Sequence, residues 1–280
     1  MFITRALKQV IPLPILLKSY LALRYSPGDL WDWLSGATDP LIPPRRKIFI
    51  GGPAFRQIGD EFFRYFQQYG QVTPHHRILD IGCGIGRMSR PFASFLDPGK
   101  GRYDGFDIDR SGVLWCLQHY LEYPHFRFTW ANIYNKFYNP SGVVPADAFV
   151  FPYEEGSFDF AFATSVFTHM PMKSIGRYLK EVHRVLASGG RALFTVFLWN
   201  AETRALVAQG KSTIPFREHG ELIVRDPLIP EEAIAVRQEE WEQAVRDAGL
   251  ERVGDILWGN WCGRDRFVTN QDMVLLRKQD

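Results

Sequence analysis

Cysteine is scarce in this chain of 280 residues, which contains only Cys83, Cys116 and Cys262. The three are far apart and form no C-x-x-C pair, so the sequence carries neither a disulfide framework nor a zinc-binding motif. Scattered thiols suit a reducing compartment, and we expect a cytoplasmic protein. The sequence also lacks His, Cys and Asp clusters with the spacing of metal ligands, so no bound metal is predicted.

An excess of charge of one sign is also lacking. The chain has 33 Lys and Arg against 31 Asp and Glu, for a net charge of +2. A charge this close to neutral argues against a nucleic-acid partner. Hydrophobic residues make up 46% of the chain, which is ordinary for a globular protein. The length suits one large domain, or one domain with a cap.

No hydrophobic run near the N-terminus is long enough to span a bilayer. The run from Val10 to Leu17 is broken by Pro12 and Pro14. Residues 1–28 nevertheless carry four basic side chains and no acidic one. Such a segment can contact anionic lipid at a membrane surface, or it can fold as a helix over the core or the active site. We expect the second arrangement.

The most informative stretch runs from Arg77 to Gly86. Its apolar residues predict a short buried parallel strand, with Asp80 near the strand end. The alternating glycines Gly82, Gly84 and Gly86 follow; they allow a sharp turn and let a ligand lie against bare main chain. A helix predicted over residues 87–96 then offers unpaired N–H groups to an anion. This pattern is typical of the first turn of a doubly wound α/β sheet, where such folds bind nucleotides.

The spacing of the glycines bears on which nucleotide is bound. A dinucleotide fingerprint needs G-x-G-x-x-G, and Arg87 stands where its third glycine belongs. The Gly-Lys-Ser/Thr of a Walker loop is also missing. The pattern Asp80-x-Gly-x-Gly-x-Gly86 instead resembles motif I of the class I S-adenosylmethionine (SAM)-dependent methyltransferases. Asp107 ends a second predicted strand, 21 residues after Gly86, where a carboxylate can accept hydrogen bonds from both ribose hydroxyls. Because NAD-dependent oxidoreductases share a glycine loop and an acid, they remain an alternative.

The resemblance is specific over residues 77–197 and includes Glu181-Val-His-Arg-Val-Leu186 followed by Gly189-Gly190, with Ser188 where the family has proline. It implies a Rossmann-like α/β fold, a doubly wound sheet of seven strands that is mostly parallel with an antiparallel last strand. It implies SAM as cofactor and S-adenosylhomocysteine as product. The cofactor-binding residues implied are Asp80, Gly82, Cys83, Gly84, Gly86, Asp107, Ile108, Asn132, Ile133 and Ser165. Asn132 ends the third predicted strand; it either binds the adenine amino group or merely closes the strand.

The methyl acceptor is expected to bind between the sheet and the segments that follow its strands. A long aromatic loop begins at residue 133 at the carboxyl end of the sheet, where ligands bind. We expect its Tyr134, Tyr138 and Asn139 to line a substrate pocket, unless the loop only packs against the sheet edge. A turn over residues 258–264 could bring Trp261 to the same cleft.

His169 lies just past the predicted central strand 158–164 and is the candidate catalytic residue. A histidine with an ordinary pKa of about 6.5 is largely neutral at pH 7 and can take a proton from an acceptor hydroxyl. The alternatives are a histidine that positions the substrate and a purely structural one. If the acceptor is an amine or a carbanion, no base is required.

We therefore expect two parts, an N-terminal helical extension or lid at residues 1–53 and a SAM-binding methyltransferase domain at 54–280. Cap insertions are expected at 133–152 and 200–238. Short phrases at 138–142, 164–170 and 261–264 look like a bacterial subgroup of small-molecule methyltransferases. The implied reaction moves a methyl group to an O-, N- or C-nucleophile of a small molecule, such as a sugar derivative or natural-product intermediate. A SAM-binding protein that acts only through its partners is the second alternative, and the oligomeric state is not predicted.

Overall fold

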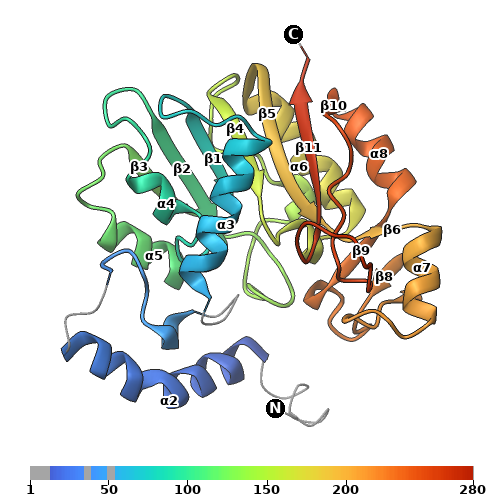
Figure 1. Ribbon diagram of the computed structural model, residues 1–280, viewed down its shortest axis with the longest axis horizontal. Helices are drawn as coiled ribbons and strands as arrows, with labels where there is room; N and C mark the ends of the chain where they lie inside the picture. The colour runs from blue at the N-terminus through green and yellow to red at the C-terminus, as the bar shows by residue number, and fades with distance from the viewer. Residues whose placement is uncertain (1–12, 35–38, 49–53, 280) are drawn as a thin grey trace.

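The computed structural model of the chain describes residues 13–34, 39–48 and 54–279 (Figure 1). Its centre is a seven-stranded sheet in the order β10-β11-β5-β4-β1-β2-β3. Strands β1 to β5 are parallel, whereas β11 runs antiparallel to β5, and β10 antiparallel to β11. The strands are β1 (Arg77–Ile81), β2 (Arg102–Asp107), β3 (Phe126–Trp130), β4 (Phe158–Ala163), β5 (Leu186–Val196), β10 (Leu250–Arg252) and β11 (Asp272–Lys278). The predicted fold class is confirmed.

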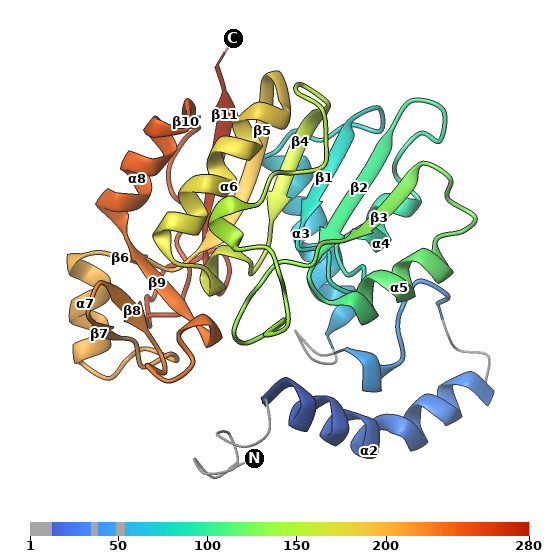
Figure 2. The same cartoon turned by 180° about the vertical axis from the view of Figure 1, so that it is seen from behind.

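Helices cover both faces of this sheet (Figures 1 and 2). Within β1, Ile78 faces one hydrophobic cluster while Leu79 and Ile81 face the other, as the alternation of a strand requires. Both faces are apolar because both are covered. The helices are α3 (Phe55–Gln68), α4 (Ser89–Ala93) and α5 (Arg110–His119) on one side, and α6 (Met172–Val185) and α8 (Gln238–Asp247) on the other. Helix α4 is shorter than the predicted helix 87–96.

A second, four-stranded sheet lies beside the first, in the order β6-β9-β8-β7. It has its own hydrophobic cluster, which includes Phe197, Phe216 and Trp261. The strands are two to four residues long, so the sequence here showed only weak periodicity. The elements are β6 (Leu198–Trp199), α7 (Ala201–Ala208), β7 (Arg217–His219), β8 (Leu222–Val224), the 3-10 helix η4 (Pro230–Glu232) and β9 (Ile234–Arg237).

Helix α2 (Leu13–Leu34) and the short 3-10 helix η1 (Arg45–Lys47) are the described parts of the N-terminal segment. Both views place α2 beyond the carboxyl ends of the parallel strands (Figures 1 and 2). Among the described helices, α2 included, none combines the length and the hydropathy needed to cross a membrane. Residues 1–12, 35–38 and 49–53 of the expected extension lie outside the described residues, and the domain division at residue 53 stays a prediction.

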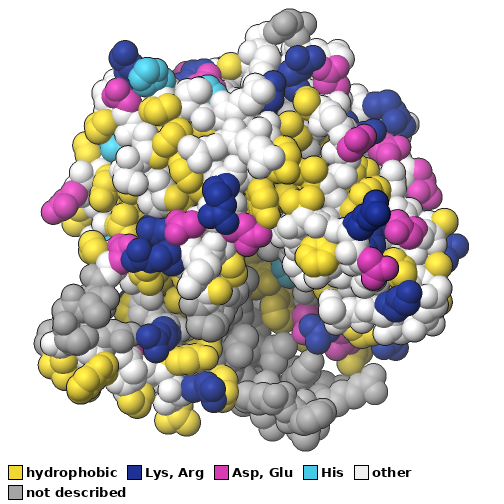
Figure 3. Space-filling view, in the orientation of Figure 1, with side chains coloured by type: hydrophobic (Ala, Val, Ile, Leu, Met, Phe, Trp, Pro, Cys, Tyr) yellow, Lys and Arg dark blue, Asp and Glu magenta, His cyan; other side chains and the backbone are white. Residues whose placement is uncertain are grey.

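Acidic and basic side chains alternate over the visible face of the molecule, in keeping with the small net charge (Figure 3). Some exposed side chains form ion pairs, such as Arg277 with Glu251. Exposed pairs of this kind contribute little to stability, typically below about 1 kcal/mol each. The buried polar contacts matter more.

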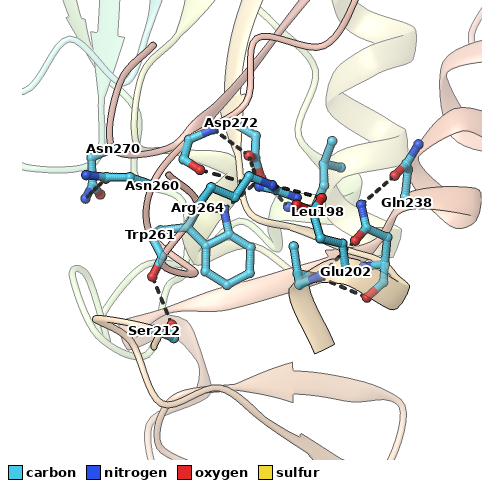
Figure 4. A network of polar contacts seen from close by, with 12 residues as sticks. Leu198, Glu202, Ser212, Gln238, Asn260, Trp261, Arg264, Asn270 and Asp272 are labelled. Atoms are coloured by element: carbon cyan, nitrogen blue, oxygen red, sulfur yellow. Dashed lines mark hydrogen bonds and ion pairs between the residues drawn. The ribbon is translucent and has the colours of Figure 1, made fainter. Parts of the chain in front are cut away.

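One buried carboxylate joins the two sheets. Asp272, at the start of β11, accepts hydrogen bonds from the main-chain N–H groups of Leu198 (2.9 Å) and Gly259 (2.8 Å). It also accepts from Trp261 Nε1 (2.8 Å) and pairs with Arg264 Nη1 (3.2 Å), as Figure 4 shows. Burial raises the pKa of Asp272, and these donors counter that effect by stabilising the ionised form. The carboxylate thereby ties the turn 258–264 and the strand β6 to the main sheet.

Replacing Asp272 with asparagine should lower the free energy of unfolding by about 1–3 kcal/mol, because buried donors lose their acceptor and the Arg264 guanidinium keeps only Glu202 as a carboxylate partner, at 3.1 Å. The amide group also turns hydrogens toward N–H donors that need an acceptor. Urea denaturation of Asp272→Asn measures the change, and the exposed Asp255→Asn is the matched control. Equal stability of the two variants would show that the Asp272 network does not hold the sheets together.

Candidate functional site

A cavity of about 620 Å³ lies at the carboxyl ends of β1, β2 and β4. The loops after these strands line it, together with residues from α3, the aromatic loop that begins at residue 133 and the segment 267–271. Adjacent parallel strands end at one edge of a sheet, so loops far apart in sequence meet there. The volume falls in the range of small-molecule sites.

The glycine loop presents bare main chain to this cavity. Gly84 has a φ of +53°, and a Cβ added to it would meet no atom closer than Asp107 Oδ2 at 4.0 Å. The Gly84 N–H donates to that oxygen at 2.6 Å. Gly82 is different: its φ is +82°, and a Cβ there would lie 2.3 Å from Val166 Cγ2. Gly82 is therefore required by packing, whereas the space at Gly84 is available to a ligand.

Asp107 is a half-buried acid that lines the cavity. One oxygen accepts from the Gly84 N–H and the other from the Asp109 N–H, each at 2.6 Å. Burial raises the pKa of Asp107 to about 6, although these main-chain donors favour the ionised form. The carboxylate is therefore ionised at neutral pH, and its remaining lone pairs can accept from two neighbouring hydroxyls. This chemistry fits a ribose.

Seven of the ten residues predicted to bind the cofactor line the cavity, namely Gly82, Cys83, Gly84, Asp107, Ile108, Ile133 and Ser165. Asp80 does not, because it is fully buried beneath the loop and accepts a hydrogen bond from the Tyr103 hydroxyl. Burial raises the pKa of Asp80 to about 8. Gly86 also lies outside the lining, and a Cβ on it would meet Cys116 Sγ at 3.1 Å. Asp80 and Gly86 thus support the loop from behind.

Asn132 and Asn139 contact each other. Asn139 Nδ2 donates to Asn132 Oδ1 at 3.2 Å and to the Ile133 carbonyl at 2.9 Å. Neither side chain lines the cavity. Their amides join the middle of the aromatic loop to its start, and their predicted roles toward adenine and substrate stay predictions.

His169 and Tyr138 meet at the inner end of the cavity, and both line it. His169 Nδ1 lies 2.9 Å from the Glu231 carbonyl oxygen, which can only accept, so Nδ1 carries the proton. Nε2 is then the acceptor for the Tyr138 hydroxyl, at 3.2 Å. Burial lowers the pKa of His169 to about 4 and raises that of Tyr138. The imidazole is therefore neutral, and its one lone pair points at Tyr138.

Tyr134 lines the cavity as predicted, but Trp261 does not. The Trp261 ring is fully buried in the small sheet's core, and its N–H is bound to Asp272. Its neighbour Asn260 reaches the cavity instead. A buried aromatic side chain cannot contact substrate, so the predicted substrate role of Trp261 is wrong.

Several polar residues that were not assigned to the site from the sequence also line the cavity, among them Lys47, Glu61, Arg87 and Gln271. Gln271 Oε1 accepts from the Ser165 hydroxyl at 3.1 Å, and Ser165 has the unusual φ of +57° for a residue with a side chain. Burial lowers the pKa of Arg87 to about 10, so it remains a cation at neutral pH. The position of Arg87 directly after the glycine loop could have identified it as a site residue from the sequence. Lys47, Glu61 and Gln271 belong to segments without a motif and could not be identified in this way.

The described residues contain no group of three or more His, Cys, Asp or Glu side chains that could hold a metal ion. Asp107 and Asp109 both line the cavity, but Asp107 uses its two oxygens on main-chain donors. The expectation of metal-free activity stays a prediction.

Comparisons with known proteins agree with this geometry. A family model described as a methyltransferase domain matches residues 79–194. Phosphoethanolamine N-methyltransferase 2 of Caenorhabditis elegans is 25% identical over 169 residues, which are 60% of this chain and 31% of that protein. A sterol 24-C-methyltransferase of Debaryomyces hansenii is 26% identical over 154 residues, which are 54% of this chain and 35% of that protein. The chain thus spans about a third of the length of these curated relatives.

The fold has a counterpart among solved structures. Burkholderia thailandensis 1,6-didemethyltoxoflavin-N1-methyltransferase, solved with bound 1,6-didemethyltoxoflavin and S-adenosylhomocysteine, superposes with a TM-score of 0.51 at 16% identity. The superposition covers 94% of this chain and 91% of that one. At this identity the likeness shows a shared fold and no more. The residues that the family model matches include the glycine loop and Asp107. Residues 79–194 of the chain are thus similar to the methyltransferase domain family, and the fold agrees with that likeness.

Proposed function

We propose that this protein binds SAM in the cavity and transfers its methyl group to a small-molecule acceptor. The observation that carries the proposal is the open main chain at Gly84 beside the Asp107 carboxylate. When bound, SAM would supply an electrophilic methyl group carried on a sulfonium. The sulfur is a good leaving group, so the protein need not activate its departure. The work left to the chain is to hold the acceptor in line with that methyl, and positioning can lower a barrier by roughly 7–11 kcal/mol.

Each part of SAM has a matching group in the cavity. Asp107 would accept hydrogen bonds from the ribose hydroxyls, and the main chain of residues 82–84 would border the methionyl part. Arg87 is the cation next to that loop and suits the methionyl carboxylate. Ile108 and Ile133 offer apolar surfaces to the adenine ring.

The acceptor is held by the inner part of the cavity, whose lining includes Tyr134, Tyr138, His169, Met170 and Tyr178. This lining is aromatic and carries no formal charge once His169 is neutral. Such a pocket suits a small, largely uncharged acceptor. The relatives named above act on phosphoethanolamine, a sterol and a didemethyltoxoflavin, which are all small molecules.

His169 and Tyr138 act on the acceptor as a pair. Because His169 Nε2 already accepts from Tyr138, an acceptor hydroxyl at the Tyr138 oxygen would pass its proton there while the tyrosine proton moves to Nε2. The low pKa of His169 makes the imidazole a weak base, so this transfer must accompany methyl transfer rather than precede it. For an amine acceptor the same pair only orients the nucleophile.

The direct test incubates the protein with methyl-labelled SAM and a panel of small molecules that carry hydroxyl, amine or activated carbon groups. Appearance of a labelled product together with S-adenosylhomocysteine supports the proposal. Calorimetry with SAM and NAD distinguishes the alternatives: tight NAD binding without SAM binding indicates an oxidoreductase. SAM binding without turnover on any acceptor points to a protein that acts through partners.

Affinity for SAM should depend on the ionisation of Asp107. The pKa of about 6 predicts that SAM affinity falls by about tenfold as the pH drops from 7 to 5, because the protonated acid accepts fewer hydrogen bonds. Calorimetry across this range measures the effect. The isosteric Asp107→Asn variant should bind SAM more weakly at pH 7, with little pH dependence. If the SAM affinity of the parent protein changed with pH as little as that of the variant, Asp107 would not be a ribose-binding residue.

A methyl group at Gly84 should block the ligand without unfolding the chain. Gly84→Ala adds its Cβ to the open side of the loop, so we expect SAM affinity to fall by at least tenfold. The control is Gly210→Ala, since Gly210 also has a positive φ, +72°, with no atom within 4 Å of the added Cβ. The two variants carry the same backbone strain, so equal SAM affinity would contradict ligand binding along Gly84.

Two substitutions separate a proton-accepting His169 from a positioning one. His169→Gln keeps a hydrogen-bond acceptor for Tyr138 but cannot take a proton. If His169 accepts the proton, kcat should fall by about 10²–10⁴-fold with an unchanged KM. Tyr138→Phe should then lower kcat in parallel, with SAM affinity unchanged in both variants. A raised KM with a preserved kcat in His169→Gln means that the pair only positions the acceptor.

A further inference from the structure

The outer face of α2 is an apolar surface that no described part of the chain covers. Leu23, Leu30 and Leu34 are seven and four residues apart, which places them on one side of the helix. Their exposed fractions are 84%, 57% and 65%, and Trp31 beside them is 72% exposed. Single exposed leucines are ordinary, but a row of three with a tryptophan is a contiguous patch. We call these four residues the outer face of α2.

The other side of α2 is fixed to the rest of the N-terminal segment. Asp29 is buried and accepts hydrogen bonds from the main-chain N–H groups of Arg45 (2.7 Å) and Arg46 (3.2 Å) in η1. It also pairs with the Arg46 guanidinium at 3.1 Å. These contacts turn the leucines outward. Hydrophobic and basic side chains accordingly lie next to one another at the lower left of Figure 3, where Figure 1 places α2.

The charge of the segment is positive although the chain is nearly neutral. Residues 1–53 hold seven Lys or Arg and three Asp, a net charge of +4, whereas residues 54–280 have a net charge of −2. Arg24 is exposed and close to the outer face, while Arg45 and Lys47 are exposed on η1. Apolar residues with tryptophan, bordered by cations, are the features of a helix that lies in a membrane interface.

We propose, in place of the arrangement expected from the sequence alone, that the outer face of α2 binds the surface of a membrane rich in anionic lipid, with the helix lying along that surface. At 22 residues α2 is about 33 Å long, so its whole apolar row can contact one bilayer face. A second copy of the chain is the competing occupant. Two segments of charge +4 repel each other, whereas anionic lipid neutralises them, so charge complementarity favours the membrane.

Attachment of α2 would also set the orientation of the cavity. Lys47 lines the cavity from η1, and η1 is bonded to α2 through Asp29. The cavity and α2 therefore lie on the same side of the sheet, at the carboxyl ends of the parallel strands (Figures 1 and 2). Membrane binding itself does not depend on the proposed transfer reaction and can be measured without any acceptor.

The test is co-sedimentation of the full chain with vesicles of phosphatidylcholine alone or mixed with phosphatidylglycerol. We expect binding to the mixed vesicles, little binding to neutral ones, and weaker binding in about 0.5 M salt, where exposed charges are screened. Leu23→Ser with Leu30→Ser should lower the partition coefficient for mixed vesicles by about tenfold or more. The matched control is Leu117→Ser with Leu121→Ser, which removes two leucines that are 45% and 79% exposed elsewhere.

SAM affinity is measured for both double variants as a check on folding, since none of the four leucines lines the cavity. Loss of vesicle binding in the α2 variant alone, with SAM affinity intact in both, supports the proposal. Failure of the parent chain to bind mixed vesicles, or an equal loss in both variants, overturns it. Light scattering tests whether a second copy of the chain occupies the outer face of α2 instead. If the parent chain is a dimer and only the α2 substitutions dissociate it, a second copy occupies this face and the membrane proposal is overturned.

Discussion

The hydrogen bond from the Gly84 N–H to Asp107 determines where the site can form. It exists because β1 and β2 are adjacent and parallel, with Ile81 opposite Phe106, so that both strands release their loops at one edge. The N–H groups of Gly82 and Cys83 also donate to the Phe106 carbonyl, at 2.8 and 3.1 Å. The path of the glycine loop is thus fixed by the register of the sheet as well as by its own glycines.

The acceptor end of the cavity depends on elements outside that nucleotide-binding half. His169 follows β4, yet its tautomer is set by the Glu231 carbonyl in η4. Gln271, which contacts Ser165, immediately precedes Asp272. The buried Asp272 carboxylate therefore holds together the turn 258–264, the small sheet and one wall of the cavity. A change in this network would alter the acceptor pocket without touching the glycine loop.

The nucleotide half of the fold could be predicted because its signals are local. Each of these signals depends on the backbone of one strand or one turn: the apolar run 78–81, the glycine spacing, and Asp107 at a strand end. In the structure all three lie at the expected places in the fold. The small sheet could not be predicted, since strands of two to four residues leave too little alternation to detect. The predictions that the Asn139 and Trp261 side chains line the cavity were wrong for another reason. Their positions in the chain were suggestive, but which way a side chain points is decided by tertiary partners, namely Asn132 and Asp272.

The charges along the cavity constrain the chemistry it can perform. Arg87 and Lys47 are cations near the glycine loop and the N-terminal segment, and Asp107 and Asp109 are acids at the end of β2. The inner end has Met170, tyrosines and His169, whose pKa is lowered because the imidazole would be poorly solvated as a cation there. A permanently charged acceptor group would meet the same cost there unless it stayed near the loops. If the proposed methyl transfer takes place here, the nucleophile that fits the inner end is neutral, and the pairing of His169 Nε2 with the Tyr138 hydroxyl gives a hydroxyl or neutral amine a defined hydrogen-bonding partner at that position.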